Sequence, residues 1–337
     1  MSALPEIRVL FRAAAGARRG FGHLVRCRSL ARALGVRPLV CVRGPAATRH
    51  IALRLGCDVV NGTARSLIAS LAPDVLVVDD PIASHARSWI AAARAANVPV
   101  VTIHDLGLGC AEGDLVIDGS VTSTIPQAKR QGTAGPSFAI LDPSVAAARP
   151  RIRRGVLVSL GGGPRLALAT AIAREITRRA PWVTVRVAGG FVAQPRSASR
   201  LKNVTWLPPS TDLVSELSRA KVAVVGGGVS LYEACAVGTA AVAVPVVGSQ
   251  GPTVAGFVTR GAALGSTHRP PRSRRIADEV VKLLQSDPLR HSVARAGRRL
   301  VDGRGAERAA RAIGQLLDRH ASLRARRAAG KGLRVAS

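Results

Sequence analysis

The chain has 337 residues and a net charge of +29, and 47% of its residues are hydrophobic. That length suits two domains of ordinary size, and the apolar runs stop well short of the roughly 20 residues that a membrane span needs, so we expect no span. The charge suggests nucleic acid as a partner, but the excess is nearly all arginine spread over many helices, and only 3% of residues are aromatic, which argues against specific nucleic-acid binding.

The cysteines and the first residues indicate the compartment. No two cysteines form a CxxC pair and their surroundings are apolar, so we expect reduced, mostly buried thiols with neither a disulfide nor a zinc site. The first ten residues carry Glu6 and Arg8 and lack the long apolar core of a signal peptide. We therefore expect a cytoplasmic protein.

Short β-branched runs alternate with Ala-, Leu- and Arg-rich segments of helical period, a pattern typical of βαβ units and parallel sheets. In the first half of the chain the expected strands are 7–11, 37–42, 75–78, 100–103 and 115–117. The clearest helix runs from His23 to Leu34, and Gly35 directly after it suits a left-handed helix end.

The same order of elements returns after a stretch with prolines and arginines at residues 143–154. Expected strands here are 155–160, 183–188, 204–207, 222–225 and 240–244, with helices at 166–179, 212–219 and 230–236. We therefore predict an α/β protein with two domains, residues 1–148 and 149–305. A C-terminal helix, 306–322, and a disordered basic tail, 323–337, are expected to follow.

The first candidate binding motif follows the first expected strand. After Arg12 and a loop of small residues, the chain reads Gly20-Phe21-Gly22-His23 at the start of a helix. Glycines allow a phosphate or sugar to approach the backbone, and the free N–H groups of a helix N-terminus favour anions. The same helix end disfavours an imidazolium, so His23 is expected to be neutral near pH 7 and able to accept a proton. A histidine that only caps its own helix explains the residues equally well.

A second glycine cluster, Gly161-Gly162-Gly163, ends the strand 155–160. The carboxyl ends of parallel strands face the ligand-binding crevice, so this cluster is expected at the cleft between the domains. A purely structural turn is the alternative interpretation.

The third cluster, Gly226-Gly227-Gly228, precedes a helix that carries Ser230 and Glu233. Three glycines before a helix offer backbone donors to a diphosphate. Glu233, expected in the first turn of the helix, can accept hydrogen bonds from two neighbouring ribose hydroxyls. A carboxylate at that place also simply suits the helix dipole, which is the structural alternative.

Polar residues end two strands of the first half. Asp79 and Asp80 follow the strand 75–78, where either could meet a substrate or cap the following turn. His104 and Asp105 end the next strand with the same ambiguity, and we interpret that pair as structural.

Ser249 and Gln250 follow the strand 240–244 and are expected at the same rim as the glycine clusters. Their hydroxyl and amide groups could bind sugar hydroxyls, or they could form an ordinary polar loop. The sequence has no Walker loop, no Ser-His-Asp order with a nucleophile elbow and no Asp-x-Asp metal motif, so neither a metal nor another cofactor is expected.

These motifs resemble the PseG/SpsG family over roughly residues 5–265. The resemblance rests on Phe11-Arg12 with Gly20-x-Gly22-His23-x-x-Arg26-Cys27, on Ser159-Leu160-Gly161-Gly162-Gly163, and on Gly226-Gly227-Gly228 with Tyr232-Glu233 and Gly238. The last motif is also similar to MurG and other GT-B glycosyltransferases. The resemblance implies a GT-B fold, in which two Rossmann-like domains with parallel sheets face an interdomain cleft.

The resemblance also implies a function. The family's type member hydrolyses UDP-2,4-diacetamido-2,4,6-trideoxy-β-L-altropyranose on the way to pseudaminic acid. By analogy His23 would activate water to displace UDP from the anomeric carbon, the second and third glycine clusters would stabilise the diphosphate without a metal, and Glu233 would hold the ribose. The remaining implied substrate-binding residues are Arg12, Gly20, Gly22, Arg26, Asp79, Ser230, Ser249 and Gln250.

The chain departs from the family pattern in three places around the sugar. Ala14 stands where the family shows the aspartate of Arg-x-Asp, Asp79-Asp80-Pro81 lacks the family's tyrosine, and Ser249 replaces an asparagine. These changes favour a different sugar or acceptor, or an inactive relative. Three interpretations therefore stay open: a UDP-sugar hydrolase, a GT-B glycosyltransferase whose arginines could help it contact anionic lipid, and a non-catalytic nucleotide-sugar-binding protein.

Overall fold

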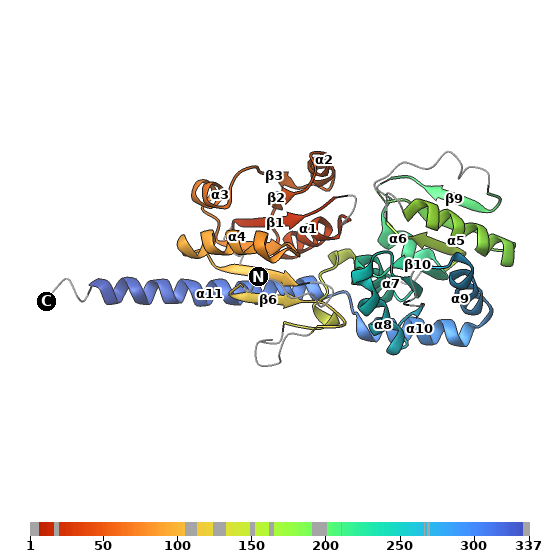
Figure 1. The fold of residues 1–337 in the computed structure, drawn as a ribbon. Helices are drawn as coiled ribbons and strands as arrows, with labels where there is room; N and C mark the ends of the chain where they lie inside the picture. Colours follow the sequence, from red (N-terminus) through yellow and green to blue (C-terminus); the bar gives the residue numbers. More distant parts are fainter. Residues whose placement is uncertain are drawn as a thin grey trace.

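The computed structural model describes residues 7–16, 20–104, 113–123, 133–148, 152–161, 165–190, 201–209, 211–265, 267 and 270–332. Figure 1 shows two α/β halves side by side, each built around one sheet. Each sheet has six strands, and every strand pair in both is parallel. The predicted α/β class, with the same architecture used twice, is confirmed.

The first sheet has the strand order β3-β2-β1-β4-β5-β6, which is the order of a Rossmann fold. Its strands are β1 (Val9–Ala14), β2 (Leu39–Arg43), β3 (Asp58–Val59), β4 (Val75–Asp79), β5 (Val100–His104) and β6 (Leu115–Asp118). Its helices are α1 (Gly22–Leu34), α2 (Ala47–Arg54), α3 (Ala64–Leu71) and α4 (Ala83–Ala95). β1 runs three residues beyond its predicted end, because Ala13 and Ala14 are fully buried and packing overrides their weak strand propensity.

The second sheet repeats the order as β12-β11-β10-β7-β8-β9. Its strands are β7 (Val156–Ser159), β8 (Val185–Ala188), β9 (Val204–Leu207), β10 (Val222–Gly226), β11 (Ala240–Val244) and β12 (Leu264–Gly265). Its helices are α5 (Arg165–Arg179), α6 (Leu213–Arg219), α7 (Val229–Ala236), α8 (Gly251–Thr259), α9 (Ser273–Gln285) and α10 (Asp287–Leu300). Short 3₁₀ turns lie at Pro136–Phe138, Pro143–Val145 and Gly248–Gln250.

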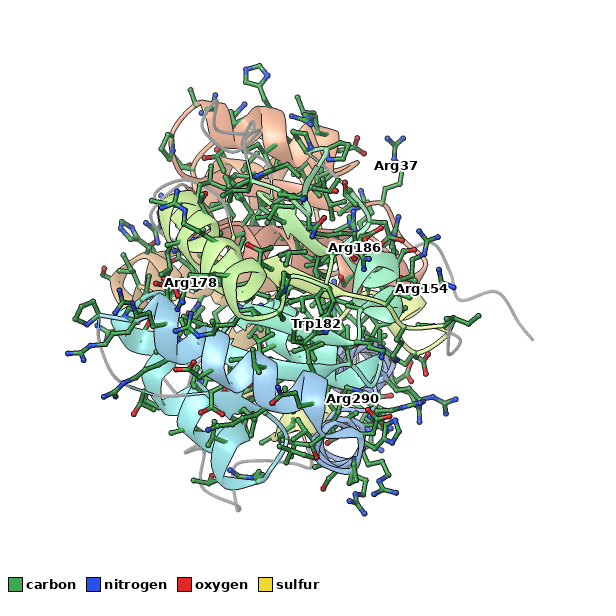
Figure 2. All side chains as sticks on the ribbon, turned by 90° about the vertical axis from the view of Figure 1, so that its right-hand side faces the viewer. Arg37, Arg154, Arg178, Trp182, Arg186 and Arg290 are labelled. Atoms are coloured by element: carbon green, nitrogen blue, oxygen red, sulfur yellow. The ribbon has the colours of Figure 1, made fainter. Side chains whose placement is uncertain are left out.

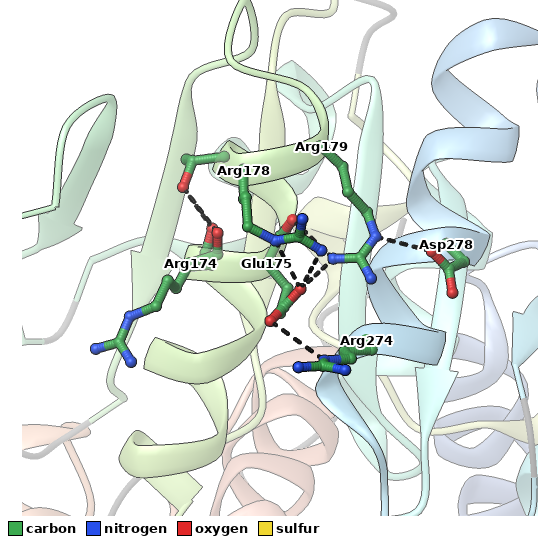
Figure 3. Close-up of polar contacts among 8 residues, drawn as sticks. Arg174, Glu175, Arg178, Arg179, Arg274 and Asp278 are labelled. Carbon is green, nitrogen blue, oxygen red and sulfur yellow. Dashed lines mark hydrogen bonds and ion pairs between the residues drawn. The ribbon is translucent and has the colours of Figure 1, made fainter.

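Arginines help to join α5 to α9 on the outside of the second half. The carboxylate of Glu175 pairs with Arg178 and Arg179, and Arg179 Nε also donates to Asp278 Oδ1 on α9 at 2.8 Å (Figure 3). Beneath these pairs the two helices share a buried core that includes Ile176 and Val280. Part of the large arginine content therefore serves packing between helices, consistent with the weak nucleic-acid inference drawn from charge.

The last helix, α11, spans Gly305–Gly332 and returns from the second half to the first. Ala306, Ala309 and Ile313 are buried in the same core as β1 and α1, and Figure 1 shows α11 running along the first half and projecting beyond it. The prediction of a disordered tail from residue 323 is wrong as far as residue 332, because this segment has no proline and is rich in alanine and arginine, both strong helix formers. Residues 333–337 lie outside the described residues.

The predicted buried thiols are confirmed for the four cysteines that the structure describes: Cys27, Cys41, Cys57 and Cys235 are buried and free. Burial raises the pKa of Cys57 to about 11 and that of Cys235 to about 12. Within the described ranges, no helix has the length and hydropathy to cross a membrane. The same ranges contain no cluster of His, Cys, Asp and Glu side chains that could hold a metal ion.

Candidate functional site

The first motif forms a closed loop that leads into α1. The backbones of Gly16 and Gly20 exchange hydrogen bonds of 3.1 and 2.7 Å, and Gly20 has φ +85°, a conformation that favours glycine. α1 then begins at Gly22, and its N-cap residue, Phe21, makes no side-chain capping bond. The N-terminal N–H groups of α1 therefore have no side-chain cap from this residue.

His23 lies in the first turn of α1 and contacts Asp79, the last residue of β4, rather than capping its own helix. His23 Nδ1 is 2.7 Å from Asp79 Oδ1. Arg26, one turn along α1, donates from Nε to Asp79 Oδ2 at 2.9 Å and from Nη2 to Oδ1 at 2.7 Å. The side chain of Asp79 is 1% exposed and that of His23 is 12% exposed. Asp79 and two residues of the first motif, which the sequence singled out separately, thus form one cluster.

The charge of Asp79 favours one tautomer of His23. Burial alone would raise the pKa of Asp79, but the positive charge of Arg26 and the hydrogen bond with His23 outweigh it and lower that pKa to about 2. An ionised carboxylate can only accept hydrogen bonds, so its contact with His23 favours a hydrogen on Nδ1, whereas Arg26 Nη2, a donor 2.7 Å from the same Nδ1, favours a bare Nδ1. In a neutral imidazole with its hydrogen on Nδ1, Nε2 keeps its lone pair, which is the arrangement of a general base held by a buried carboxylate.

The neighbouring Asp80 takes the role of turn cap that the sequence left open between the two aspartates. Its Oδ1 accepts the N–H of Ile82 at 3.0 Å, and Arg43 donates to both of its oxygens at 2.7 and 2.5 Å. Asp79 and Asp80 therefore have different partners, although they are adjacent in sequence. The pKa of Asp80 is lowered, since its hydrogen bonds outweigh the opposing effect of burial.

Arg12 does not join this cluster. Side chains alternate along β1, so Phe11 and Ala13 pack toward α1 whereas Arg12 lies on the opposite face. There its guanidinium carbon is 5.0 Å from the ring centroid of Trp89, and Nη1 donates to Cys41 Sγ at 3.3 Å. The structure thus keeps Arg12 apart from His23, and its predicted contact with substrate stays a prediction.

The second and third glycine clusters lie side by side because β7 and β10 are neighbours in the sheet. Gly161 has φ +84°, so this position favours glycine. A Cβ placed on Gly226 would stand 3.7 Å from the carbonyl oxygen of Leu160. Gly162 and Gly163 lie outside the described residues.

The Ser249–Gln250 loop packs against the third cluster, as the sequence predicted for the rim. Gln250 Oε1 accepts the N–H of Val246 at 3.0 Å, and Nε2 stands 3.4 Å from where a Cβ on Gly228 would lie. A Cβ on Gly227 would collide with Val254 at 2.7 Å, so no side chain fits there. Ser249 is exposed, whereas Gln250 is partly buried.

The first and third motifs meet across the junction of the two halves. A Cβ on Gly22 would lie 3.4 Å from Cγ2 of Val229, the first residue of α7. A cavity of about 30 Å³ lies beside them, lined by Arg26 and His104 from the first half and by Tyr232 from the second, together with Ile103, Gly119, Phe138, Ala139, Ile140, Leu141 and Val229. Two helix N-termini, each with positive partial charge, therefore converge beside His23.

Glu233 differs from its prediction in one respect. α7 begins at Val229, one residue earlier than predicted, so Glu233 lies in the second turn and the first turn carries no acidic residue. The side chain is buried, and burial together with the charges of Asp142 and Asp212 raises its pKa to about 7, against the opposing effect of Arg28. A carboxyl group in this position owes little to the helix dipole, so the structural alternative loses its main support. Ser230, three residues earlier, is partly buried.

Arg165 is a candidate binding residue that the sequence analysis missed. It is the first residue of α5, and its Nη1 lies 3.3 Å from the Cβ position on Gly161. Burial lowers its pKa, and it has no carboxylate partner among the described residues. The available signal was an arginine directly after a glycine cluster and Pro164, but it is one of many arginines in the chain.

Comparison with known proteins agrees with this architecture. No family model matches the sequence. The spore coat polysaccharide biosynthesis protein SpsG of Bacillus subtilis is 30% identical over 185 residues, which cover 51% of this chain and 54% of SpsG. The match thus spans about half the length of that relative.

Solved structures match nearly the whole chain. The spinosyn rhamnosyltransferase SpnG in complex with spinosyn aglycone has a TM-score of 0.64 at 17% identity, covering 92% of this chain and all of SpnG. The MnaA–UDP structure from S. aureus has a TM-score of 0.62 at 11% identity, covering 92% and 96%. With the two Rossmann-ordered sheets, these matches give the chain the GT-B fold. Within that class it is similar to SpsG over about half its length, which supports the resemblance that its motifs predicted.

Proposed function

We propose that the chain is an enzyme of surface-polysaccharide biosynthesis that acts on a nucleotide sugar. In this proposal it is a PseG-type hydrolase that displaces UDP from the anomeric carbon of a UDP-amino sugar. The observation that carries the proposal is the His23–Asp79–Arg26 cluster at the point where the N-termini of α1 and α7 meet. The names of the relatives support it, since SpsG is a polysaccharide biosynthesis protein and MnaA was solved with UDP.

In this proposal the two halves of the chain have different roles. Residues 1–148, with α11 packed on them, supply the base and the sugar side, and residues 149–305 hold the nucleotide. Glu233 accepts hydrogen bonds from the ribose hydroxyls, and the backbone N–H groups at the start of α5 and at the start of α7 bind the diphosphate. The reaction takes place in the cytoplasm, as the sequence predicts.

The reaction follows from the position of the base. Nε2 of His23 takes a proton from water as the water oxygen attacks the anomeric carbon, and the bond between that carbon and the diphosphate oxygen breaks. The bonding electron pair leaves with UDP, and the negative charge of Asp79 stabilises the imidazolium that forms. Preorganised N–H groups and the guanidinium of Arg165 stabilise the departing diphosphate, so the step needs no metal.

A glycosyltransferase is the second candidate function. The same base would then deprotonate a hydroxyl of an acceptor instead of water, and the sugar would pass to that acceptor. The structural match to SpnG solved with its aglycone supports this alternative. A non-catalytic nucleotide-sugar-binding protein would keep the nucleotide site and show no turnover.

The test incubates the purified full chain with a panel of UDP-, GDP-, CMP- and dTDP-sugars and follows free nucleotide by chromatography. Release without an acceptor that is lost in His23→Ala supports the hydrolase and names the nucleotide. Release only after an acceptor is added supports the transferase. Nucleotide binding without release under either condition would overturn the proposal of an enzyme.

Arg165→Gln is expected to weaken UDP binding roughly tenfold, because a charge-assisted hydrogen bond to the diphosphate is lost. Isothermal titration calorimetry with UDP measures the change. Arg174→Gln is the matched control, since Arg174 is exposed farther along α5 and should bind UDP as the unaltered chain does. Equal affinities for the two variants would exclude Arg165 from the nucleotide site.

A further inference from the structure

One end of the molecule lies away from the candidate site. In the second sheet all strands are parallel, and their C-terminal ends carry the glycine clusters at the junction of the halves, so their N-terminal ends lie at the opposite edge. Figure 2 looks onto this end of the second half: Trp182 stands near its middle, with Arg154, Arg178, Arg186 and Arg290 around it.

Two large hydrophobic side chains stand out of this edge. Ile152 is 81% exposed and Trp182 is 67% exposed, the highest values among the large hydrophobic residues that the structure describes. The segments that carry them enter the neighbouring strands β7 and β8 and are joined by the hydrogen bond from Val156 N to Thr184 O at 2.9 Å. The two side chains therefore precede neighbouring strands at the same edge of the sheet.

Three exposed cations accompany them. Arg154, Lys202 and Lys221 are exposed just before β7, β9 and β10. None has an ion pair within the described part of the chain, although the charge of Lys221 helps to lower the pKa of Asp287. Backbone hydrogen bonds hold these segments next to one another, from Lys221 N to Gly155 O at 3.1 Å and from Val185 N to Asn203 O at 2.9 Å. The nearby Arg178, Arg186 and Arg290 are different, because they pair with Glu175, Glu216 and Asp287.

We propose that the surface formed by Ile152, Arg154, Trp182, Lys202 and Lys221, called here the sheet-edge surface, docks on an anionic lipid bilayer. Tryptophan favours the boundary between headgroups and hydrocarbon, and exposed basic side chains are attracted to anionic headgroups. An apolar contact combined with a basic patch supplies the two signals that peripheral binding needs.

Other partners fit the sheet-edge surface less well. Single-stranded nucleic acid binds on several stacked aromatic rings, whereas this surface offers one ring and an aliphatic side chain that cannot stack. A second copy of the chain would bring another +29 charges against an already basic surface. Docking at this edge also leaves the junction between the halves free, because it lies at the other ends of the same strands. The inference is therefore independent of the proposed function.

The experiment mixes the full chain with vesicles of phosphatidylglycerol and phosphatidylcholine in a roughly one-to-three ratio, and with phosphatidylcholine alone, and measures binding by sedimentation. Binding is expected only to the anionic vesicles. The triple variant Arg154→Glu, Lys202→Glu, Lys221→Glu should lower the partition coefficient by at least roughly 100-fold, at about fivefold for each basic residue. Lipid-borne bromine should quench the fluorescence of Trp182, and Trp182→Ala should abolish the quenching, because Trp89 is buried and Trp206 is partly buried.

The matched control reverses Arg49, Arg324 and Arg326, which are exposed cations outside the sheet-edge surface. This control should bind the anionic vesicles within roughly threefold of the unaltered chain, since its sheet-edge surface is intact. An equal loss in both triple variants would assign the binding to net charge and overturn the proposal. So would vesicle binding without quenching of Trp182, or salt-sensitive binding to RNA in place of vesicles. All substituted side chains are exposed, so the variants are expected to fold.

Discussion

Asp79→Asn is expected to lower the rate of nucleotide release by roughly 10³- to 10⁴-fold, with little change in UDP affinity. An asparagine side chain can donate its amide hydrogen to Nδ1 of His23, which would stabilise the tautomer with its hydrogen on Nε2. The ring would keep its place, but its free lone pair would face away from the substrate. Steady-state rates with the nucleotide sugar found in the panel measure kcat, and calorimetry measures the affinity for UDP.

Asp80→Asn is the matched control for this experiment. Each substitution removes a buried carboxylate from an arginine, Arg26 for Asp79 and Arg43 for Asp80, so each is expected to lower the free energy of unfolding by about 3 kcal/mol or more. Urea denaturation measures this loss, and assays are run where both variants are folded. Only Asp79 touches His23, so Asp80→Asn should keep its activity. A similar loss of kcat in both variants would mean that Asp79 acts on the fold and not on the base.

The sequence predicted most of the sheet architecture because the strands are buried β-branched runs with clear ends. β3 and β12 were not predicted, since two residues are too short to show a strand period. The docking of α11 on the first half could not be predicted either, because a helical pattern shows which face is apolar and not which core it joins. The full length of α11 was not predicted either, because the basic composition of the segment after residue 322 is also typical of a disordered tail.

The candidate site was predictable in its motifs and less so in its contacts. Glycine clusters after strands indicate the rim of a parallel sheet, and the structure brings Gly161, Gly226 and Gln250 together there. The choice between Asp79 and Asp80 was not predictable, because adjacent residues on a strand point to opposite faces and their partners come from distant parts of the chain. The same alternation separates Arg12 from His23.

The departures from the family pattern leave the contacts of the proposed base, His23, in place. Ala14 is fully buried at the end of β1, so the family's aspartate at this place has no polar replacement. Pro81 is exposed and directly follows Asp80, in the turn that Asp80 caps. His23 and Arg26 both keep hydrogen-bonding distance to Asp79 despite these changes. Within the proposed function, this geometry favours altered sugar selectivity over an inactive relative.

Glu233→Gln is expected to stabilise the fold at alkaline pH while weakening nucleotide binding. The pKa of Glu233 is raised to about 7 in the folded chain from an ordinary value of 4.5, so the folded state binds more protons between these two pH values. Stability therefore falls as pH rises through this range, by about 3 kcal/mol in total, and a neutral glutamine removes that loss. Urea denaturation should show the variant more stable than the unaltered chain at about pH 8 and similar to it near pH 5.

Binding of UDP tests whether the buried Glu233 carboxylate, which lowers the stability of the fold at alkaline pH, contributes to the nucleotide site. At about pH 8 the ionised Glu233 can accept hydrogen bonds from both ribose hydroxyls, whereas glutamine offers one oxygen, so affinity for UDP should fall roughly tenfold. Glu307→Gln, on the exposed side of α11, is the control and should change neither property by more than about 0.5 kcal/mol. Unchanged UDP affinity in Glu233→Gln would remove Glu233 from the nucleotide site. Equal gains in stability at both pH values would contradict the raised pKa.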